Sequence, residues 1–400
     1  MSTTETNFYG LGIAPAILGV IERLKFVTPT KIQHQAIPIG LQGQDVMGIA
    51  QTGTGKTMAF GIPMIQRLEQ IKGRALVVVP TRELAIQVDE SLHKIASALG
   101  LRTAVLIGGD SMHKQLQSLK SHPRILIGTP GRLIDHMQQK TLNLHDIHIL
   151  VLDEADRMLD MGFGPQIATL LKQVPADRQT MLFSATMPET IMNIAKNYMR
   201  LPVRVEVAPS GTTAERVVQE LFIVRKELKQ QLLESMLDQC QGSVLIFCRT
   251  KFGVMKLTRQ LRQINKYKVT ETHSDRSLGQ RKEALEGFKR GKYRILVATD
   301  IAARGIDVKG IELVINYDLP DDPENYVHRI GRTGRAGFAG RAISFAMPDQ
   351  RLEVKNIERI INQTLPVAES HPTIPLEKFH IPKTPVMAYQ TPKSLRRRRR

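Results

Sequence analysis

The sequence predicts an α/β protein made of two parallel-sheet domains in tandem with a cleft between them. Short, continuously apolar, β-branched runs alternate with helix-length amphipathic stretches, which is the pattern of parallel strands covered by helices on both faces. A polar break that contains proline and glycine divides two such series near residue 210. The length of 400 residues exceeds what one ordinary core needs and is enough for two domains.

The composition describes a folded chain with a basic surface. Hydrophobic residues make up 42% and charged residues 24% of the chain, which excludes collagen-like and wholly disordered proteins. The formal net charge of +18 favours a polyanionic partner, either nucleic acid or an acidic membrane surface. Only 2 cysteines are present, so one disulfide is the maximum, a four-cysteine metal site is excluded, and a reducing compartment fits best.

The sequence has no pattern typical of an export signal or a membrane span. Its first residues lack the basic and then apolar order of a signal peptide. No apolar run approaches the roughly 20 residues that a helix needs to cross a bilayer. We therefore expect a cytoplasmic protein without a membrane partner.

The first half, residues 1–206, is expected to form one parallel sheet. Each of its apolar runs has the length of a strand and precedes a stretch with helical periodicity. A short polar segment, residues 207–215, contains a proline and a glycine and is the expected linker between domains. The expected strands are residues 46–49, 75–79, 103–107, 124–127, 148–152 and 179–183.

The second half, residues 216–365, has the same alternation without residue-level similarity to the first. Residues 366–400 are rich in proline and end in Lys393 and a run of arginines at 396–400, which predicts a disordered basic tail. The arginine run is either an expression remnant or solvated end, or an electrostatic tether for nucleic acid. The expected strands are residues 218–224, 243–247, 267–272, 294–298, 313–317 and 341–345.

A glycine-rich turn follows the first expected strand and precedes an apolar helical pattern. In that position backbone N–H groups point toward a phosphate at the positive end of the helix. Lys56 is expected to reach the β- and γ-phosphates of a nucleotide, and Thr57 to bind Mg²⁺. The pattern is a P-loop with one departure, because Ala50 stands where the general motif begins with glycine. Its residues are Ala50, Gln51, Thr52, Gly53, Thr54, Gly55, Lys56 and Thr57.

An acidic motif, residues 153–156, follows the apolar run at 147–152. A carboxylate at the C-terminal end of a parallel strand faces the phosphate crevice, so Asp153 can bind Mg²⁺ and Glu154 can polarise the attacking water. Taken alone, these residues also fit an acidic helix start. The apolar strand before them and the upstream P-loop favour a nucleoside triphosphatase.

Hydrolysis of a nucleotide also needs positive charge near the transferred phosphate. In residues 328–335, Arg332 and Arg335 stand three positions apart after a glycine, so both can lie on one side of a helix start and reach across the cleft. They are candidate arginine fingers, and their place on the second domain would link hydrolysis to domain closure. The alternative is that they are surface arginines that pair with nearby acids or bind RNA.

These three motifs together resemble those of the DEAD-box ATP-dependent RNA helicases, and the resemblance covers residues 8 to about 350. It implies two RecA-like domains, ATP hydrolysis with Mg²⁺, and RNA binding that is largely independent of sequence. Among the family, the chain is most similar to the bacterial RhlE-type members. Further motifs of the family stand in order at residues 26–33, 80–85, 108–109, 129–132, 184–186 and 298–307.

The resemblance also implies roles at the nucleotide. Gln33 would read the adenine edge while Phe26 packs on the base, which makes the site selective for ATP. Gly305 and Asp307 would approach the ribose when the domains close. The residues that would couple the nucleotide to RNA are Asp156, Ser184, Thr186 and His328.

For RNA, the resemblance implies phosphate contacts from small, hydroxyl and arginine side chains on loops of both domains. Two positions depart from the family pattern. Lys25 stands in place of the usual glycine before Phe26, and Leu278 replaces the usual glutamine three residues before Arg281, which leaves one second-domain RNA contact open. The implied RNA contacts are Arg82, Gly109, Thr129, Arg132, Arg249, Arg281 and Thr299.

The expected function is an ATP-dependent RNA helicase in which ATP with Mg²⁺ and single-stranded RNA jointly close the two domains. Closure would kink the bound strand and so unwind short duplexes locally or remodel ribonucleoproteins, with ribosomal and mRNA-decay particles as candidate partners. One alternative is an ATP-gated RNA clamp or scaffold with little unwinding, which the same residues would serve. The other is a translocating DNA helicase, against which Gln33 and the motif at 153–156 argue.

Overall fold

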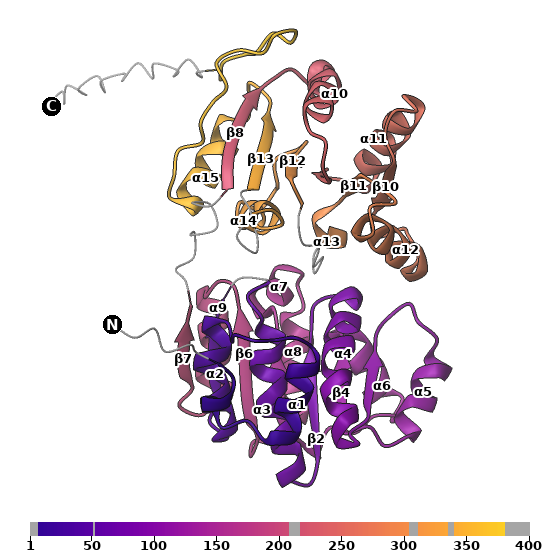
Figure 1. Cartoon of the computed structure of the whole chain (residues 1–400), viewed down its shortest axis with the longest axis vertical. Helices are drawn as coiled ribbons and strands as arrows, with labels where there is room; N and C mark the ends of the chain where they lie inside the picture. Colours follow the sequence, from indigo (N-terminus) through magenta and orange to yellow (C-terminus); the bar gives the residue numbers. More distant parts are fainter. Residues whose placement is uncertain (1–6, 51–52, 208–216, 304–310, 335–339, 381–400) are drawn as a thin grey trace, which may run out of the picture.

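The computed structural model describes residues 7–50, 53–207, 217–303, 311–334 and 340–380. Two α/β domains, each built on a parallel sheet, are stacked along the long axis of the molecule (Figure 1). This architecture confirms the expected fold class, and every expected strand lies within two residues of its expected bounds. The agreement has a simple cause, because most of these strands are fully buried and therefore continuously apolar.

The first domain contains a 7-stranded sheet with the order β3-β4-β2-β5-β6-β1-β7, and all neighbouring strands are parallel. The sequence does not predict β7, because it is a short edge strand that alternates exposed residues with a buried valine. The strands are β1 (Val46–Ile49), β2 (Arg74–Val78), β3 (Thr103–Leu106), β4 (Ile125–Gly128), β5 (Ile147–Leu152), β6 (Gln179–Ser184) and β7 (Val203–Glu206).

Helices cover both faces of this sheet and enclose two apolar cores. The first core lies under α1 (Pro15–Arg23), α2 (Lys31–Leu41), α3 (Lys56–Gln70) and α4 (Arg82–Ala96). The second core includes residues of α6 (Pro130–Gln138), α7 (Ala155–Asp160), α8 (Gly164–Gln173) and α9 (Glu189–Tyr198). Helix α5 (Met112–Lys120) packs beside β3 at the edge of the sheet.

The second domain contains a 6-stranded parallel sheet with the order β10-β11-β9-β12-β13-β8. Within the described ranges, no helix of either domain combines the length and the apolar composition that crossing a membrane demands. The strands are β8 (Val217–Ile223), β9 (Val244–Phe247), β10 (Val269–Thr272), β11 (Ile295–Ala298), β12 (Leu313–Asn316) and β13 (Gly340–Ala346). The helices are α10 (Lys229–Gln239), α11 (Lys251–Gln263), α12 (Leu278–Lys289), α13 (Asp300–Ala303), α14 (Glu324–Ile330) and α15 (Arg351–Ile361).

The loops at the carboxyl ends of the strands carry most of the sequence motifs in both domains. Ligands of open parallel sheets bind beyond these ends. The P-loop follows β1, and the motif at 153–156 follows β5. The two domains meet on the same side, where Arg281 of α12 pairs with Glu83 of α4. The motifs are therefore gathered at the boundary between the domains.

The segment after α15 differs from the expected tail in its first part. Val367 pairs with Leu221 of β8, and the Glu377 N–H donates a hydrogen bond to the Ile223 carbonyl at 2.8 Å. Ile374 is buried in the adjoining core. Proline is tolerated here because a segment at a sheet edge needs few N–H groups for pairing. Residues 366–380 therefore pack as part of the second domain, whereas residues 381–400, with the terminal arginines, lie outside the described residues. Residues 208–215 of the expected linker lie outside them as well.

Candidate active site and nucleic-acid interface

The P-loop places a buried lysine at the start of α3. Gly55 caps this helix with a φ of 93°, in the left-handed region that glycine adopts without strain. The Lys56 side chain is buried, and no described residue accepts a hydrogen bond from its Nζ. A buried ammonium group without a partner is costly until an anion satisfies it. Together with the first N–H groups of α3, Lys56 therefore fits a phosphate group.

The other P-loop residues extend this phosphate site. Ala50 is buried at the end of β1, and Gly53 has a φ of 85° in the turn. Thr57 follows Lys56 in the first turn of α3. Gln51 and Thr52 lie outside the described residues.

Gln33 ties the P-loop to the segment that precedes α2. Its Oε1 accepts a hydrogen bond from the Thr30 N–H at 3.0 Å, and its Nε2 donates to the Gly55 carbonyl at 3.1 Å. The amide keeps one further N–H and one further acceptor lone pair, which is the pair that an adenine edge requires. Phe26 is 45% exposed and so offers its ring for stacking. Lys25 has a φ of 59°, which explains why glycine suits this position.

Two neighbouring carboxylates at the end of β5 have opposite pKa shifts. Burial raises the pKa of Asp153 to about 6, and the Lys56 ammonium offsets only part of this effect. Burial would also raise the pKa of Glu154, but the charges of Arg157, Lys56 and Arg332 lower it to about 2. Glu154 has a φ of 52°, a conformation that non-glycine residues rarely adopt and that clusters at functional sites. Glu154 is therefore fully ionised at neutral pH, whereas Asp153 titrates closer to neutral pH because nearby positive charge offsets only part of its burial.

The oxygen donors at this point suit a hard divalent cation. The Thr57 hydroxyl and the Asp153 carboxylate are ligands of the kind that Mg²⁺ prefers. A bound dication would lower the raised pKa of Asp153 and so favour its ionised form. In the part of the chain that the structure describes, no cluster of three or more His, Cys, Asp or Glu residues forms a complete metal cage. Mg²⁺ is usually held by one or two carboxylates together with substrate phosphates.

Asp156 is bonded to the loop that follows β6. Its Oδ2 accepts hydrogen bonds from the N–H groups of Ala185 and Thr186 at 3.0 and 2.8 Å, and from Thr186 Oγ1 at 3.0 Å. The Ser184 Oγ accepts a hydrogen bond from the Asp156 N–H at 3.2 Å. The structure thus brings Asp156, Ser184 and Thr186 together, so a movement of the acidic turn would move this loop. Their role in coupling stays a prediction.

Second-domain residues approach the acidic turn from across the boundary. Arg332 is buried, and its charge contributes to the low pKa of Glu154. Burial lowers the pKa of His328 to about 4, although the charge of Asp156 opposes the shift, so the imidazole is neutral at pH 7. These two residues therefore lie within electrostatic reach of the first-domain carboxylates.

The position of Arg332 corrects one expectation. It does not lie at a helix start, because α14 ends at Ile330 and Gly331 caps its C-terminus. The Arg332 Nε donates a hydrogen bond to the His328 carbonyl at 3.2 Å, which satisfies one of the last carbonyl groups of that helix. Arg335, Gly305 and Asp307 lie outside the described residues.

A cavity of about 400 Å³ at the domain boundary collects most of the residues implied in RNA binding. Gly109 lies beside it with a φ of 73°, and a Cβ at this position would collide with the Arg82 guanidinium. The arginines and hydroxyl groups suit a phosphate backbone, because they offer donors without a fixed base-reading pattern. The lining includes Arg82, Thr129, Arg132, Ser274 and Arg281.

Two further residues implied in RNA binding do not line this cavity. Arg249 donates a hydrogen bond to the Leu319 carbonyl at 3.2 Å and pairs with Asp321 at 3.1 Å. Thr299 follows β11, and its N–H donates to the Thr272 carbonyl at 3.4 Å. Their contacts with RNA stay predictions.

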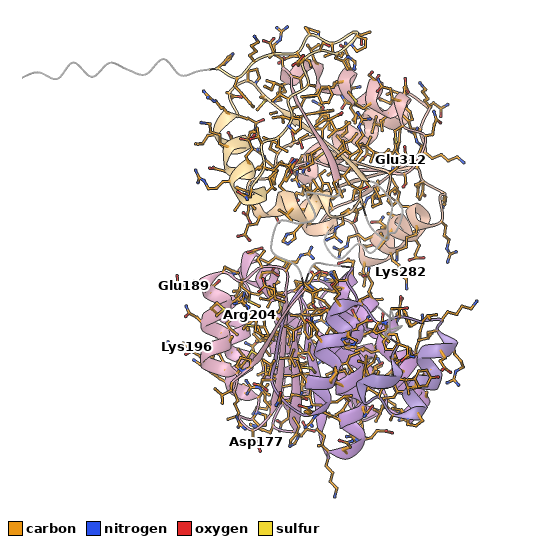
Figure 2. All side chains as sticks on the ribbon, turned by 60° about the vertical axis from the view of Figure 1, so that its left-hand side comes forward. Asp177, Glu189, Lys196, Arg204, Lys282 and Glu312 are labelled. Atoms are coloured by element: carbon orange, nitrogen blue, oxygen red, sulfur yellow. The ribbon has the colours of Figure 1, made fainter. Side chains whose placement is uncertain are left out.

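A contact between α4 and α12 joins the two domains beside the cavity. Arg281 Nη2 lies 2.9 Å from Glu83 Oε1, and these side chains are only 10% and 12% exposed. Lys282, which Figure 2 labels at the domain boundary, lies 3.8 Å from Glu90. Leu278 packs against the first-domain core. The departure at this position therefore adds an apolar contact between the domains.

Sequence reasoning missed the acidic partners in this contact and one buried arginine. Glu83 and Glu90 lie in a regular amphipathic helix, and no local pattern shows that they pair across the boundary. Arg329 is 1% exposed, and its Nε and Nη2 donate to the two Asp300 carboxylate oxygens at 2.6 and 2.7 Å. This bidentate pair fixes α14 against α13. The sequence feature that could have identified Arg329 is its place directly after His328 in the motif at 328–335.

The chain matches two family models. The DEAD/DEAH box helicase model matches residues 30–194, and the helicase conserved C-terminal domain model matches residues 226–337. A curated relative, DEAD-box ATP-dependent RNA helicase CshA of Geobacillus kaustophilus, is 46% identical over 357 residues, which is 88% of this chain and 76% of the relative. The name CshA does not support the narrower resemblance to RhlE-type members, which stays a prediction.

Two solved structures with the same architecture contain RNA and a nucleotide analogue. S. cerevisiae Dbp5 bound to RNA and ADP BeF3 gives a TM-score of 0.80 at 31% identity and covers 91% of this chain and 95% of that chain. Mss116p bound to ssRNA and AMP-PNP gives a TM-score of 0.83 at 28% identity and covers 92% of this chain and 81% of that chain.

Proposed function

This chain belongs to the DEAD-box family of ATP-dependent RNA helicases, and from that premise we propose that closure of its two domains around ATP and one RNA strand separates short duplexes locally or remodels ribonucleoproteins. The observation that carries the proposal is that the buried Arg332, on the second domain, lies within electrostatic reach of Glu154 on the first. Because the two halves of the hydrolytic site lie on different domains, hydrolysis depends on closure.

The residues of the first domain bind and orient the nucleotide in this proposal. Lys56 contacts the β- and γ-phosphates, and Thr57 and Asp153 hold Mg²⁺, which neutralises phosphate charge when bound. Glu154 accepts a hydrogen bond from the attacking water and aligns it with the γ-phosphate. Gln33 and Phe26 contact the adenine, and the remaining P-loop residues donate backbone N–H groups to phosphate oxygens.

The second domain supplies the residues that make hydrolysis depend on closure. Arg332 and Arg335 stabilise the negative charge that develops on the transferred phosphoryl group. Asp156, with the loop bonded to it, transmits the state of the nucleotide to the RNA side. His328 is neutral at pH 7 and so does not add a second positive charge to Arg332. Gly305 and Asp307 are assigned to the ribose on the family resemblance alone.

RNA would lie across the cavity at the domain boundary. Arg82, Gly109, Thr129 and Arg132 bind its phosphates from the first domain, and Arg249, Arg281 and Thr299 from the second. Backbone contacts of this kind position a strand without reading its sequence. Ribosomal and mRNA-decay ribonucleoproteins and a cytoplasmic location stay predictions, and so does the alternative of a clamp with little unwinding.

The test of this function is steady-state ATP hydrolysis with and without single-stranded RNA. Because RNA and ATP both favour the closed state, we expect RNA to raise the rate by about 5- to 150-fold, the usual range of such coupling. A DNA strand of the same sequence serves as the control and should have little effect. If the rate of ATP hydrolysis does not change when RNA is added, domain closure does not couple the binding of ATP to the binding of RNA.

A second test concerns the apolar contact of α12 with the first domain. Leu278→Gln is expected to lower the ratio of closed to open molecules about fivefold when a nucleotide analogue is bound without RNA, because about 1 kcal/mol of partial leucine burial is lost. Fluorescence energy transfer between dyes on the two domains measures that fraction. Leu352→Gln on α15 is the matched control, since Leu352 is 68% exposed. Equal closed fractions in both variants would show that Leu278 does not stabilise closure.

A further inference from the structure

Helix α11 presents a strip of exposed side chains that none of the contacts above uses. Phe252 is 69% exposed and Met255 is 45% exposed, and Lys256, Arg259 and Arg262 are exposed as well. At 3.6 residues per turn, these positions fall within about a third of the helix circumference. They are therefore neighbours on one face, which we call the α11 strip.

The cations of the α11 strip lack counter-ions among the residues that the structure describes. No acidic residue occurs in α11, and Lys256, Arg259 and Arg262 form no ion pair within the described ranges. The basic residues next to the strip behave differently, since Lys251 pairs with Asp275 at 3.0 Å and Lys266 with Asp238 at 2.6 Å. The strip is therefore a local source of uncompensated positive charge.

An exposed aromatic ring among such cations favours nucleic acid over another partner. Surfaces that bind single strands combine basic residues, which contact phosphates, with aromatic rings, on which bases stack. Phe252 supplies a ring, and the Lys251 Nζ lies 5.2 Å from its centroid, so this ring already contacts a cation. A protein partner would instead be expected to bury a larger apolar patch than one phenylalanine and one methionine.

The strip is continuous with the cavity at the domain boundary. Ser274 lines this cavity together with Arg281, and the next residue, Asp275, pairs with Lys251 at the first turn of α11. Helix α11 packs against β10 and β11 in one apolar core of the second domain, and α12 packs against the same two strands in the other core (Figure 1). A strand that leaves the cavity over Ser274 would therefore meet Phe252 first and the three cations after it.

We propose that the α11 strip is a second RNA-binding surface, which holds the part of a single strand that leaves the cleft over the second domain. Residues 252–262 span about 15 Å at 1.5 Å per residue, which matches about four phosphates at about 3.4 Å spacing in a stacked strand. Phe252 stacks on an unpaired base, and the three cations bind successive phosphates. The strip thus adds affinity for longer RNA without adding sequence specificity. This proposal rests on the RNA helicase function and deepens it.

The test compares RNA strands of two lengths on the full chain. We use fluorescence anisotropy with a nucleotide analogue, an oligouridine of ~6 nucleotides that fills only the cleft, and one of ~20 nucleotides that also reaches the strip. Phe252→Ala is expected to weaken binding of the longer strand about tenfold by removing one stacked base. The triple variant Lys256→Gln, Arg259→Gln and Arg262→Gln is expected to reduce the slope of log Kd against log salt by about 2, since each phosphate contact with a single strand contributes about 0.7. Binding of the shorter strand should not change.

Helix α15 provides a matched control at the opposite edge of the second sheet. The triple variant Arg351→Gln, Lys355→Gln and Arg359→Gln removes the same charge, and Leu352→Ala removes a comparable exposed side chain. Equal effects of the α11 and α15 variants would overturn the proposal in favour of a general field of the protein. If the α11 variants bind the longer strand as tightly as the wild type, the proposal is also overturned and the α11 strip is assigned to a protein partner. If they weaken binding of both strands equally, the strip is assigned to the cleft. If RNA does not change the rate of ATP hydrolysis by the wild-type chain, that result contradicts the helicase function itself.

Discussion

Glu154→Gln is expected to lower kcat for RNA-stimulated ATP hydrolysis by about 10²- to 10⁴-fold while the chain stays folded. Glutamine has nearly the shape of glutamate but carries no charge and accepts fewer hydrogen bonds, so the attacking water loses its orientation. The low pKa of Glu154, about 2, makes its carboxylate a weak base. Its main contribution is therefore to orient and polarise the water, and this function does not titrate between pH 6 and 8.

The same variant should retain both ligands, because the phosphate and RNA contacts do not involve Glu154. We expect slow release of RNA in the presence of ATP, measured by chase with unlabelled RNA, together with the loss of steady-state phosphate release. Glu69→Gln is the control, since Glu69 is exposed near the C-terminal end of α3. Full turnover by Glu154→Gln would remove Glu154 from the hydrolytic site.

The sequence predicts the sheets well because burial and strand sequence are tightly linked in parallel sheets. β5 and β11 are apolar at nearly every position, so period and length identify them without any knowledge of their neighbours. The sequence does not predict β7 because only Val205 is buried in it, and its pairing with β1 depends on a neighbour distant in sequence. Packing of residues 366–380 is not predicted for a related reason. Their composition suggests a disordered tail, whereas the edge of β8 provides a strand for them to pair with.

The active site divides in the same way between local and distant features. Lys56 and Asp153 follow strands that sequence can locate, so their motifs are predictable from chain order alone. The pairing of Arg281 with Glu83, and of Arg329 with Asp300, depends on tertiary contacts that leave no periodic pattern. The place of Arg332 beyond a helix end depends on where α14 stops, and helix ends are less certain from sequence than helix centres.

Arg332→Ala is expected to lower kcat by about 10³- to 10⁵-fold, the range that arginine fingers contribute in phosphoryl transfer. Its guanidinium is buried and held by the hydrogen bond from Nε to the His328 carbonyl, so its charge is positioned before the reaction begins. Because Lys56 and the P-loop remain, the affinity for ATP should change little. The loss should therefore appear in single-turnover phosphate release and not in nucleotide binding.

Arg332→Lys separates charge from geometry. Lysine keeps the positive charge but has a single amine, which cannot donate to the His328 carbonyl and reach a phosphate at the same time. We therefore expect only a small part of the activity to return, with Arg359→Ala on exposed α15 as the control. A variant at 332 that weakens ATP binding but keeps the single-turnover rate would assign this arginine to the ground state. That result would also contradict the proposal that hydrolysis depends on domain closure. The proposal relies on Arg332 because this second-domain residue lowers the pKa of Glu154 on the first domain.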